Sequence, residues 1–278
     1  MIDVLEAPVN ANKALWEKGD FTQIARTMRQ SGEDLVETLD IRPRMKLLDL
    51  GCGDGTTALP AAQRGALVLG VDIAENLVAA GNARAAKADL DNLRFQQGDA
   101  SRLTGLADAS FDLVVSIVGA MFAPRPDDVA REMVRVTRPG GRIVMGNWIP
   151  GDPTLVAQIL RISSAYTPAP PAGFVSPMTW GDEEIVRDRF AAAGIERDNI
   201  RFERAAWVFR ADGAPAELLG IFRDYYGPTM NAFDTAAKDG REKQLQAELA
   251  DLFDSRNRAA TGTEIPATFL KVTVTKES

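Results

Sequence analysis

Short apolar runs alternate with amphipathic stretches through the first half of the chain. The apolar runs cover residues 47–50, 67–71, 111–117 and 143–147, and residues 93–96 form a short further strand pattern. Between them, the spacing of apolar side chains predicts helices over residues 56–64, 74–88 and 127–137. Strands that alternate with helices form parallel sheets covered by helices on both faces. The near-continuous apolar run at 111–117 is typical of a central strand that is buried on both sides.

Helical and loop segments flank this alternating region. Residues 1–42 carry apolar side chains at helical spacing and are predicted to form an N-terminal helical arm. Residues 43–147 are the predicted core. Residues 148–181 contain an apolar helix at 155–164 and a proline-rich loop in which a helix cannot persist. Such a loop beside strand ends often shapes the mouth of a substrate site.

The C-terminal part, residues 182–278, is predicted to complete the sheet and to carry a helical cap. A helical pattern over residues 182–193 ends at Gly194, and strand patterns follow at 195–203, 206–209 and 265–275. The predicted cap insertion covers about residues 213–260, with helical patterns at 215–230 and 241–258. Its apolar side consists of Leu218, Leu219, Phe222, Tyr225, Tyr226 and Met230. It is expected to cover the site or, alternatively, to form a dimer contact.

A glycine-rich loop follows the first predicted strand. Gly51, Gly53 and Gly55 allow positive φ angles and let a ligand approach the backbone closely. The helix that begins near Thr56 directs its free N–H groups at that ligand. Asp72 ends the next strand, where an acid is placed to accept both hydroxyls of a ribose. The pattern predicts a site for a nucleotide-like ligand.

The acids beside the loop favour one class of nucleotide. Asp49 and Asp54 would repel a diphosphate, whereas the ammonium group of an amino-acid-bearing nucleoside is attracted by them. They therefore favour S-adenosylmethionine (SAM) over NAD. ATP is disfavoured further, because no Lys-Ser/Thr pair follows the glycines. An NAD-binding domain and a Rossmann-like domain without a ligand are the alternatives.

Two motifs resemble a known family. Asp49-x-Gly51-x-Gly53-x-Gly55, with Asp72 ending the next strand, resembles the first two motifs of class I SAM-dependent methyltransferases. Residues 134–141, with Arg138-Pro139-Gly140-Gly141 at their end, resemble the turn before the fifth strand in small-molecule methyltransferases, in particular the ubiquinone/menaquinone-biosynthesis C-methyltransferase-like group. The resemblance implies an α/β fold: a Rossmann-like, seven-stranded, mostly parallel sheet with an antiparallel last strand.

The resemblance also implies which residues bind SAM. Ile73 would lie on one face of the adenine and Asp99 would bond its amino group. The alternative role of Asp99 is a helix cap for Ser101 onward, and both roles can hold. Trp16 and Phe21 of the arm either cover the cofactor as a lid or belong to a helix packed under the sheet. The expected cofactor-binding residues are Asp49, Gly51, Cys52, Gly53, Thr56, Asp72, Ile73, Asp99, Ala100, Ser116 and Phe21.

The acceptor side of the site is predicted to be apolar. The Asp/Asn-Pro-Pro-Tyr motif of methyltransferases that act on exocyclic amines of bases is absent after residue 117. The expected substrate-lining residues are Met121, Phe122, Trp148, Phe174, Trp180 and Tyr225. The alternative is that these side chains belong to the hydrophobic core or pack the proline-rich loop against the rest of the domain.

Composition excludes several other functions. The 278 residues include no histidine and one cysteine, which rules out Ser-His-Asp catalysis, histidine-bound metal and internal disulfides. No metal is expected. The net charge of −7 and the lack of a basic cluster argue against nucleic acid as a substrate. No apolar stretch is long enough to span a membrane, and we expect a cytoplasmic monomer or homodimer.

The expected reaction is in-line transfer of the methyl group of SAM to a small-molecule acceptor. Catalysis is expected to come from positioning and exclusion of water. Without histidine, the candidate bases are Asp, Glu, tyrosine or a bound water, and the sequence distinguishes none of them. A protein that binds SAM or its product S-adenosylhomocysteine (SAH) without transferring the methyl group is the alternative. An NAD-dependent oxidoreductase is disfavoured because no Tyr-x-x-x-Lys pair is present.

Overall fold

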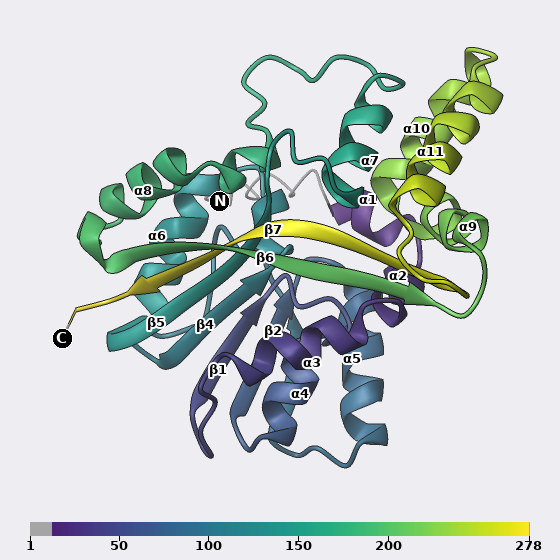
Figure 1. The fold of residues 1–278 in the computed structure, drawn as a ribbon. Coiled ribbons are helices and arrows are strands. Elements are labelled where there is room, and N and C mark those ends of the chain that lie inside the picture. The colour runs from purple at the N-terminus through teal and green to yellow at the C-terminus, as the bar shows by residue number, and fades with distance from the viewer. Residues whose placement is uncertain (1–12, 278) are drawn as a thin grey trace, which may run out of the picture.

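A computed structural model describes residues 13–277, and its centre is one seven-stranded sheet (Figure 1). The strand order is β3-β2-β1-β4-β5-β7-β6. The first five strands are parallel, and β7 is antiparallel to both of its neighbours, β5 and β6. The strands are β1 (Lys46–Leu50), β2 (Leu67–Asp72), β3 (Leu93–Gln97), β4 (Phe111–Ile117), β5 (Thr137–Trp148), β6 (Ile200–Ala211) and β7 (Thr263–Thr275). The predicted fold class is confirmed.

Helices cover both faces of the sheet (Figure 1). One face is covered by α3 (Arg29–Glu37), α4 (Ala58–Gln63) and α5 (Glu75–Lys87), and the other by α6 (Pro126–Val136) and α8 (Glu183–Ala192). Because neighbouring side chains of a strand point to opposite faces, Leu47 packs with the first group and Leu48 with the second. Both leucines are fully buried, as expected for a parallel strand covered on both sides.

Further helices gather beyond the carboxyl-end side of the sheet, where Figure 1 shows them as a group. They are α7 (Leu155–Ser164), α9 (Pro215–Tyr225), α10 (Gly227–Lys238) and α11 (Glu242–Arg256). We call these four helices the cap. The short helices α1 (Lys13–Glu17) and α2 (Phe21–Arg26) of the arm contact α10 and α9 of the cap, respectively. None of the helices between residues 13 and 277 has the length and apolar character needed to cross a membrane.

The structure differs from the sequence prediction at three boundaries. The predicted helix 215–230 is two helices, because Gly227-Pro228 starts a new helix after the extended residue Tyr226. β5 begins at Thr137 rather than at residue 143, since Thr137 pairs with Phe111 ahead of a bulge. The expected strand at 195–203 begins only at residue 200, after the 3-10 helix η3 (Arg197–Asn199). Residues 1–12 of the predicted arm lie outside the described residues.

Candidate functional site

A cavity opens at the carboxyl ends of β1, β2 and β4. It holds about 1170 Å³ of space between protein atoms, its open mouth included. Its position is the switch point of the sheet, where the strand order reverses between β1 and β4.

The two halves of the cavity have different chemistry. The half next to the strand ends is lined by the glycine loop and its acids: Asp49, Gly51, Cys52, Gly53, Asp54, Thr56, Thr57, Asp72 and Ile73. The half beneath the arm and the cap is lined by apolar and aromatic side chains: Trp16, Phe21, Ile24, Met28, Phe122, Ala123, Trp148, Val156, Trp207, Phe209, Phe222 and Tyr226. We call the first the polar half and the second the aromatic half.

Each glycine of the loop has its own reason to be glycine. Gly51, Gly53 and Gly55 all have positive φ angles, of 65°, 54° and 91°. A Cβ on Gly51 would lie 2.5 Å from the backbone of Gly119, and one on Gly55 would lie 2.7 Å from the ring of Phe95. A Cβ on Gly53 would meet nothing closer than Phe21, 4.0 Å away, and would point into open space. Gly51 and Gly55 therefore avoid clashes with the protein itself, whereas the absence of a side chain at Gly53 leaves space that a ligand can occupy.

Asp72 is fixed by the loop that it faces. Its carboxylate accepts hydrogen bonds from the Gly53 N–H at 2.8 Å and from the Ala74 N–H at 2.9 Å. Burial raises its pKa, and the backbone N–H groups counteract that rise. Each carboxylate oxygen accepts more than one hydrogen bond. Asp72 thus has remaining capacity for ligand hydroxyls at a position set by two backbone donors.

Within the described part of the chain, Asp49 is a buried acid that lacks a hydrogen-bond partner for one of its carboxylate oxygens. It is 2% exposed, and its Oδ2 has no hydrogen-bond partner among the described residues. Burial first, and then the negative charge of Asp72, raise its pKa to about 7, against a hydrogen bond from the Ala58 N–H. A cationic group in the polar half would stabilise the ionised form of Asp49. The Asp49 carboxylate therefore fits the ammonium group of SAM better than it fits a diphosphate.

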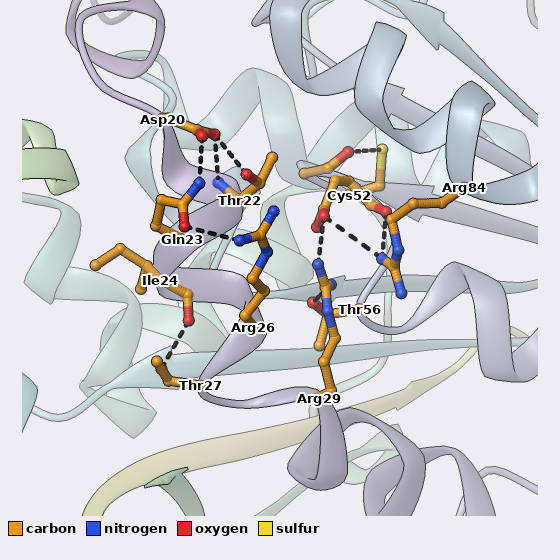
Figure 2. A network of polar contacts seen from close by, with 12 residues as sticks. Asp20, Thr22, Gln23, Ile24, Arg26, Thr27, Arg29, Cys52, Thr56 and Arg84 are labelled. Atoms are coloured by element: carbon orange, nitrogen blue, oxygen red, sulfur yellow. Dashed lines mark hydrogen bonds and ion pairs between the residues drawn. The ribbon is translucent and has the colours of Figure 1, made fainter. Parts of the chain in front are cut away.

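Asp54 differs from Asp49 because protein cations approach its carboxylate, although its Oδ1 also has no hydrogen-bond partner among the described residues. Its attraction for the ammonium group stays a prediction. Its carboxylate forms an ion pair with Arg29 of α3, and Arg84 of α5 lies 3.6 Å away. Arg29 also donates to the Thr56 hydroxyl, and Figure 2 shows Arg29 and Arg84 approaching the loop from two sides. Two protein cations already neutralise Asp54, so it holds the loop against the helices.

The structure brings most of the expected cofactor residues to the cavity. Those on its lining are Phe21, Asp49, Gly51, Cys52, Gly53, Thr56, Asp72, Ile73 and Ala100. Burial raises the pKa of the Cys52 thiol, which keeps it neutral. Whether these residues contact the cofactor stays a prediction.

Two expected cofactor residues lie off this lining. The Ser116 hydroxyl donates to the Leu50 carbonyl at 2.7 Å and accepts the Ala120 N–H at 2.9 Å, so it ties β1 to β4. Asp99 borders a second hollow, which shares Val71 and Gly98 with the cavity, and it accepts hydrogen bonds from the N–H and hydroxyl of Ser101. No helix begins at Ser101, so the helix-cap alternative for Asp99 is wrong, and these two bonds instead close a turn. The contact of Asp99 with adenine remains a prediction.

Only two of the expected substrate-lining residues, Phe122 and Trp148, reach the cavity. Met121 and Trp180 are buried in the core, where Trp180 packs against Phe190. Phe174, in the proline-rich loop, is 55% exposed.

Tyr225, the last of the expected substrate-lining residues, is 38% exposed at the end of α9. Its neighbour Tyr226 lines the cavity instead. Phe222 and Tyr226 had been predicted only as part of the apolar side of the cap. Their spacing of four would place them together on a continuous helix, but Tyr226 lies just past the end of α9 in an extended conformation. No sequence pattern placed Met28, Trp207 and Phe209 at the cavity, because only tertiary packing brings them to its lining.

The arm closes over the aromatic half. The Trp16 ring lies 4.9 Å from the ring of Phe122 and 6.1 Å from that of Tyr226, centroid to centroid. The Glu17 carboxylate accepts the Glu75 N–H at 3.0 Å. Lys18 donates to Asp234 of α10. Side chains of the arm therefore connect α5 of the core to the cap.

Comparisons with known proteins agree with this geometry. Residues 48–145 match the family model described as a methyltransferase domain. An uncharacterized protein of Mycobacterium tuberculosis is 35% identical over 253 residues, which cover 89% of this chain and 88% of that protein. This chain belongs to the class I SAM-dependent methyltransferases. SAM is the cofactor of this methyltransferase.

Two named methyltransferases are more distant. The 27-O-demethylrifamycin SV methyltransferase of Amycolatopsis mediterranei is 35% identical over 142 residues, which cover 50% of this chain and 52% of that enzyme. The structure of phosphoethanolamine N-methyltransferase 2 of Haemonchus contortus, bound to phosphomonomethylethanolamine and SAH, matches with a TM-score of 0.61 at 18% identity. That match covers 96% of this chain and 60% of the other, and it shows a shared fold. Membership of the quinone-biosynthesis subgroup stays a prediction.

Proposed function

We propose that this methyltransferase transfers the methyl group of SAM to an apolar small molecule that lies in the aromatic half of the cavity. One observation carries the proposal: a single cavity joins the glycine loop and its acids to a chamber of aromatic side chains. The relative from Amycolatopsis, whose name gives a rifamycin as its substrate, supports a small-molecule acceptor. The cover formed by the arm and cap argues against a macromolecule.

The polar half has residues for each part of SAM. Asp72 would accept the ribose hydroxyls, Asp49 would pair with the ammonium group, and the backbone at Gly53 would lie against the ligand. When bound, SAM supplies a methyl group on a sulfonium, which is a good leaving group. The protein's task is then to align the acceptor with the methyl carbon and to exclude water. Alignment of this kind is worth effective molarities of about 10⁵ M or more.

The part of the chain that the structure describes offers no strong base in the aromatic half. Tyr226 is the only ionisable residue among the described lining residues, and burial raises the pKa of its hydroxyl. The acceptor must therefore bring a nucleophilic lone pair of its own, as an ionised phenol or enol or as a neutral amine does. We propose catalysis by proximity and desolvation, with no covalent intermediate on the protein.

Methyl transfer is tested with labelled cofactor. The protein is incubated with methyl-labelled SAM and a panel of phenols, quinols and amines, and the label is followed into product. We expect label in at least one class, together with one SAH for each methyl transferred. Binding of SAM without label in any class would contradict the proposal and favour a protein that binds SAM without transferring its methyl group.

Asp49 makes SAM binding depend on pH. Its pKa of about 7 in the folded protein lies above the 3.8 of a free aspartate side chain, so between these pH values the ligand-free protein holds a proton that the unfolded chain has released. This group therefore makes the ligand-free protein less stable as the pH rises from about 4 to 7. Only ionised Asp49 pairs with an ammonium group, so SAM affinity should rise from about pH 5 to 7. It should fall above about pH 8, where α-amino groups lose their charge.

The measurement is a calorimetric titration with SAM between about pH 5 and 9. Asp49→Asn has the same shape but no charge to gain, and it should lose the rise on the acid side while keeping the fall on the basic side. An unchanged acid side in Asp49→Asn would place the titrating group elsewhere.

We propose that the arm acts as a lid, because Trp16 and Phe21 lie over the cavity that the cofactor must enter.

Binding of SAH is expected to slow amide hydrogen exchange in residues 20–28, while residues 105–109, away from the cavity, keep their rate. Lys18→Ala, which removes the contact with Asp234, should raise the rate of SAH release. Lys13→Ala, which removes only a 3.7 Å pair with Glu17, is the matched control. Equal exchange with and without SAH would refute the lid.

A further inference from the structure

The Tyr226 hydroxyl stands out in the aromatic half of the cavity. Tyr226 is 4% exposed, and its ring packs against Phe222 at 5.5 Å and Phe21 at 6.3 Å between centroids. No hydrogen bond joins its hydroxyl to any described residue, although the ring lines the cavity. Buried tyrosine hydroxyls usually have a partner. A polar group placed in an apolar chamber without a protein partner indicates a ligand partner.

The surroundings determine what that hydroxyl does. Burial alone raises the pKa of Tyr226, so the hydroxyl stays protonated and serves as a donor rather than as a base. The only other polar hydrogens on this lining are indole N–H groups. Of these, the Trp207 N–H donates to the Met28 sulfur at 2.8 Å, whereas the Trp16 and Trp148 N–H groups have no hydrogen-bond partner among the described residues. Tyr226 supplies the only hydroxyl among the described residues that line this half.

The charge of the cavity restricts the acceptor further. Among residues 13–277, none with a carboxylate lines the aromatic half, so no described acid there would hold an ammonium acceptor. Bound SAM adds a positive sulfonium, which repels a cation and attracts an anion in a low-dielectric site. Both features favour an acceptor whose nucleophile is an anionic oxygen.

We infer that the acceptor is a phenol or enol and that the Tyr226 hydroxyl donates a hydrogen bond to its ionised oxygen. This rests on the proposed methyl transfer. The acceptor's proton goes to water at the mouth of the cavity before transfer, and Tyr226 keeps its own proton. A lone pair of the acceptor oxygen forms the new C–O bond to the methyl carbon. The S–C bond breaks, its electron pair stays on sulfur, and the products are SAH and a methyl ether or enol ether.

The chain supplies a matched pair of variants. Tyr226→Phe removes only the cavity hydroxyl and keeps the ring contacts. Because that hydroxyl has no hydrogen-bond partner among the described residues, its loss should leave the thermal unfolding midpoint unchanged. Tyr225→Phe removes the same atom from the adjacent exposed ring and serves as the control.

The probe is 4-nitrophenol, whose absorption band reports whether it is bound as phenol or phenolate. With the protein saturated with SAH, we expect it to bind as the phenolate. Tyr226→Phe should weaken that binding about tenfold or more, as for a hydrogen bond to a charged group, and should raise the pH at which the bound probe ionises. Tyr225→Phe should bind it as the wild type does. Nitrobenzene, which lacks the hydroxyl, should bind equally to all three proteins.

Three results would overturn the inference while leaving the proposed function intact: equal binding of 4-nitrophenol to wild type and Tyr226→Phe, no binding of 4-nitrophenol, or binding of the probe only as neutral phenol. SAH binding is measured separately on each protein. Failure of SAH to bind the wild type would instead contradict the proposed function.

Discussion

Replacement of Gly53 by alanine is expected to weaken SAM binding by at least about tenfold, or 1.4 kcal/mol. The Cβ would project into the cavity, where Phe21 at 4.0 Å is the nearest protein atom, and would occupy the surface on which the ligand packs. Valine at the same position should abolish binding. The measurement is a calorimetric titration with SAM.

Backbone strain needs its own control, because Gly53 has a φ of 54°. An alanine in this region costs about 1–2 kcal/mol of stability whatever the space around it. Gly105 has a φ of 83°, no atom within 4 Å of a Cβ, and no place on the cavity lining. Gly105→Ala should therefore be destabilised to a similar degree and bind SAM normally. Wild-type affinity in Gly53→Ala would show that the cofactor does not lie against this loop.

Replacement of Asp72 by alanine is expected to weaken SAM binding by about 1.5–3 kcal/mol, roughly 10- to 150-fold. The variant loses an acceptor of charge-assisted hydrogen bonds from ribose. It also leaves the N–H groups of Gly53 and Ala74 without their acceptor, so the free energy of unfolding should fall as well. Equilibrium dialysis with labelled SAM gives the affinity, and urea unfolding gives the stability.

Asp112 separates these two effects. It accepts the Lys46 N–H at 2.7 Å and pairs with Arg138, at the opposite end of β1 and β4 from the cavity. Asp112→Ala should also lose stability, because a backbone N–H again loses its partner, yet it should bind SAM as the wild type does. If both variants bind SAM normally, or both lose it equally, Asp72 has no direct role.

The core of the fold could be predicted from local pattern. Each parallel strand is an apolar run, and β4 occupies Phe111–Ile117, the same residues as its run in the sequence. The glycine loop could be predicted because steric demands on the backbone are local. Boundaries were less predictable where pairing partners decide them: β5 extends to Thr137 because Phe111 pairs with it.

The aromatic half of the cavity could be predicted only in outline. Its lining comes from the arm, β5, β6, α7 and α9, which are far apart in sequence. Sequence composition showed that aromatic residues were available, but not which of them face the cavity. Tyr225 and Tyr226 are neighbours with the same side chain, and only the packing of α9 against the core decides which one faces inward. Asp54 is a similar case, since its ion pair with Arg29 depends on the placement of α3.

A crystal structure of the protein with SAH tests the central claim most directly. We expect the nucleoside at the carboxyl ends of β1, β2 and β4, with its ribose on Asp72, its ammonium group near Asp49 and its sulfur facing the rings of Trp16, Phe122 and Tyr226. An empty cavity with SAH bound elsewhere on the surface would contradict the account, as would a ribose that makes no contact with Asp72.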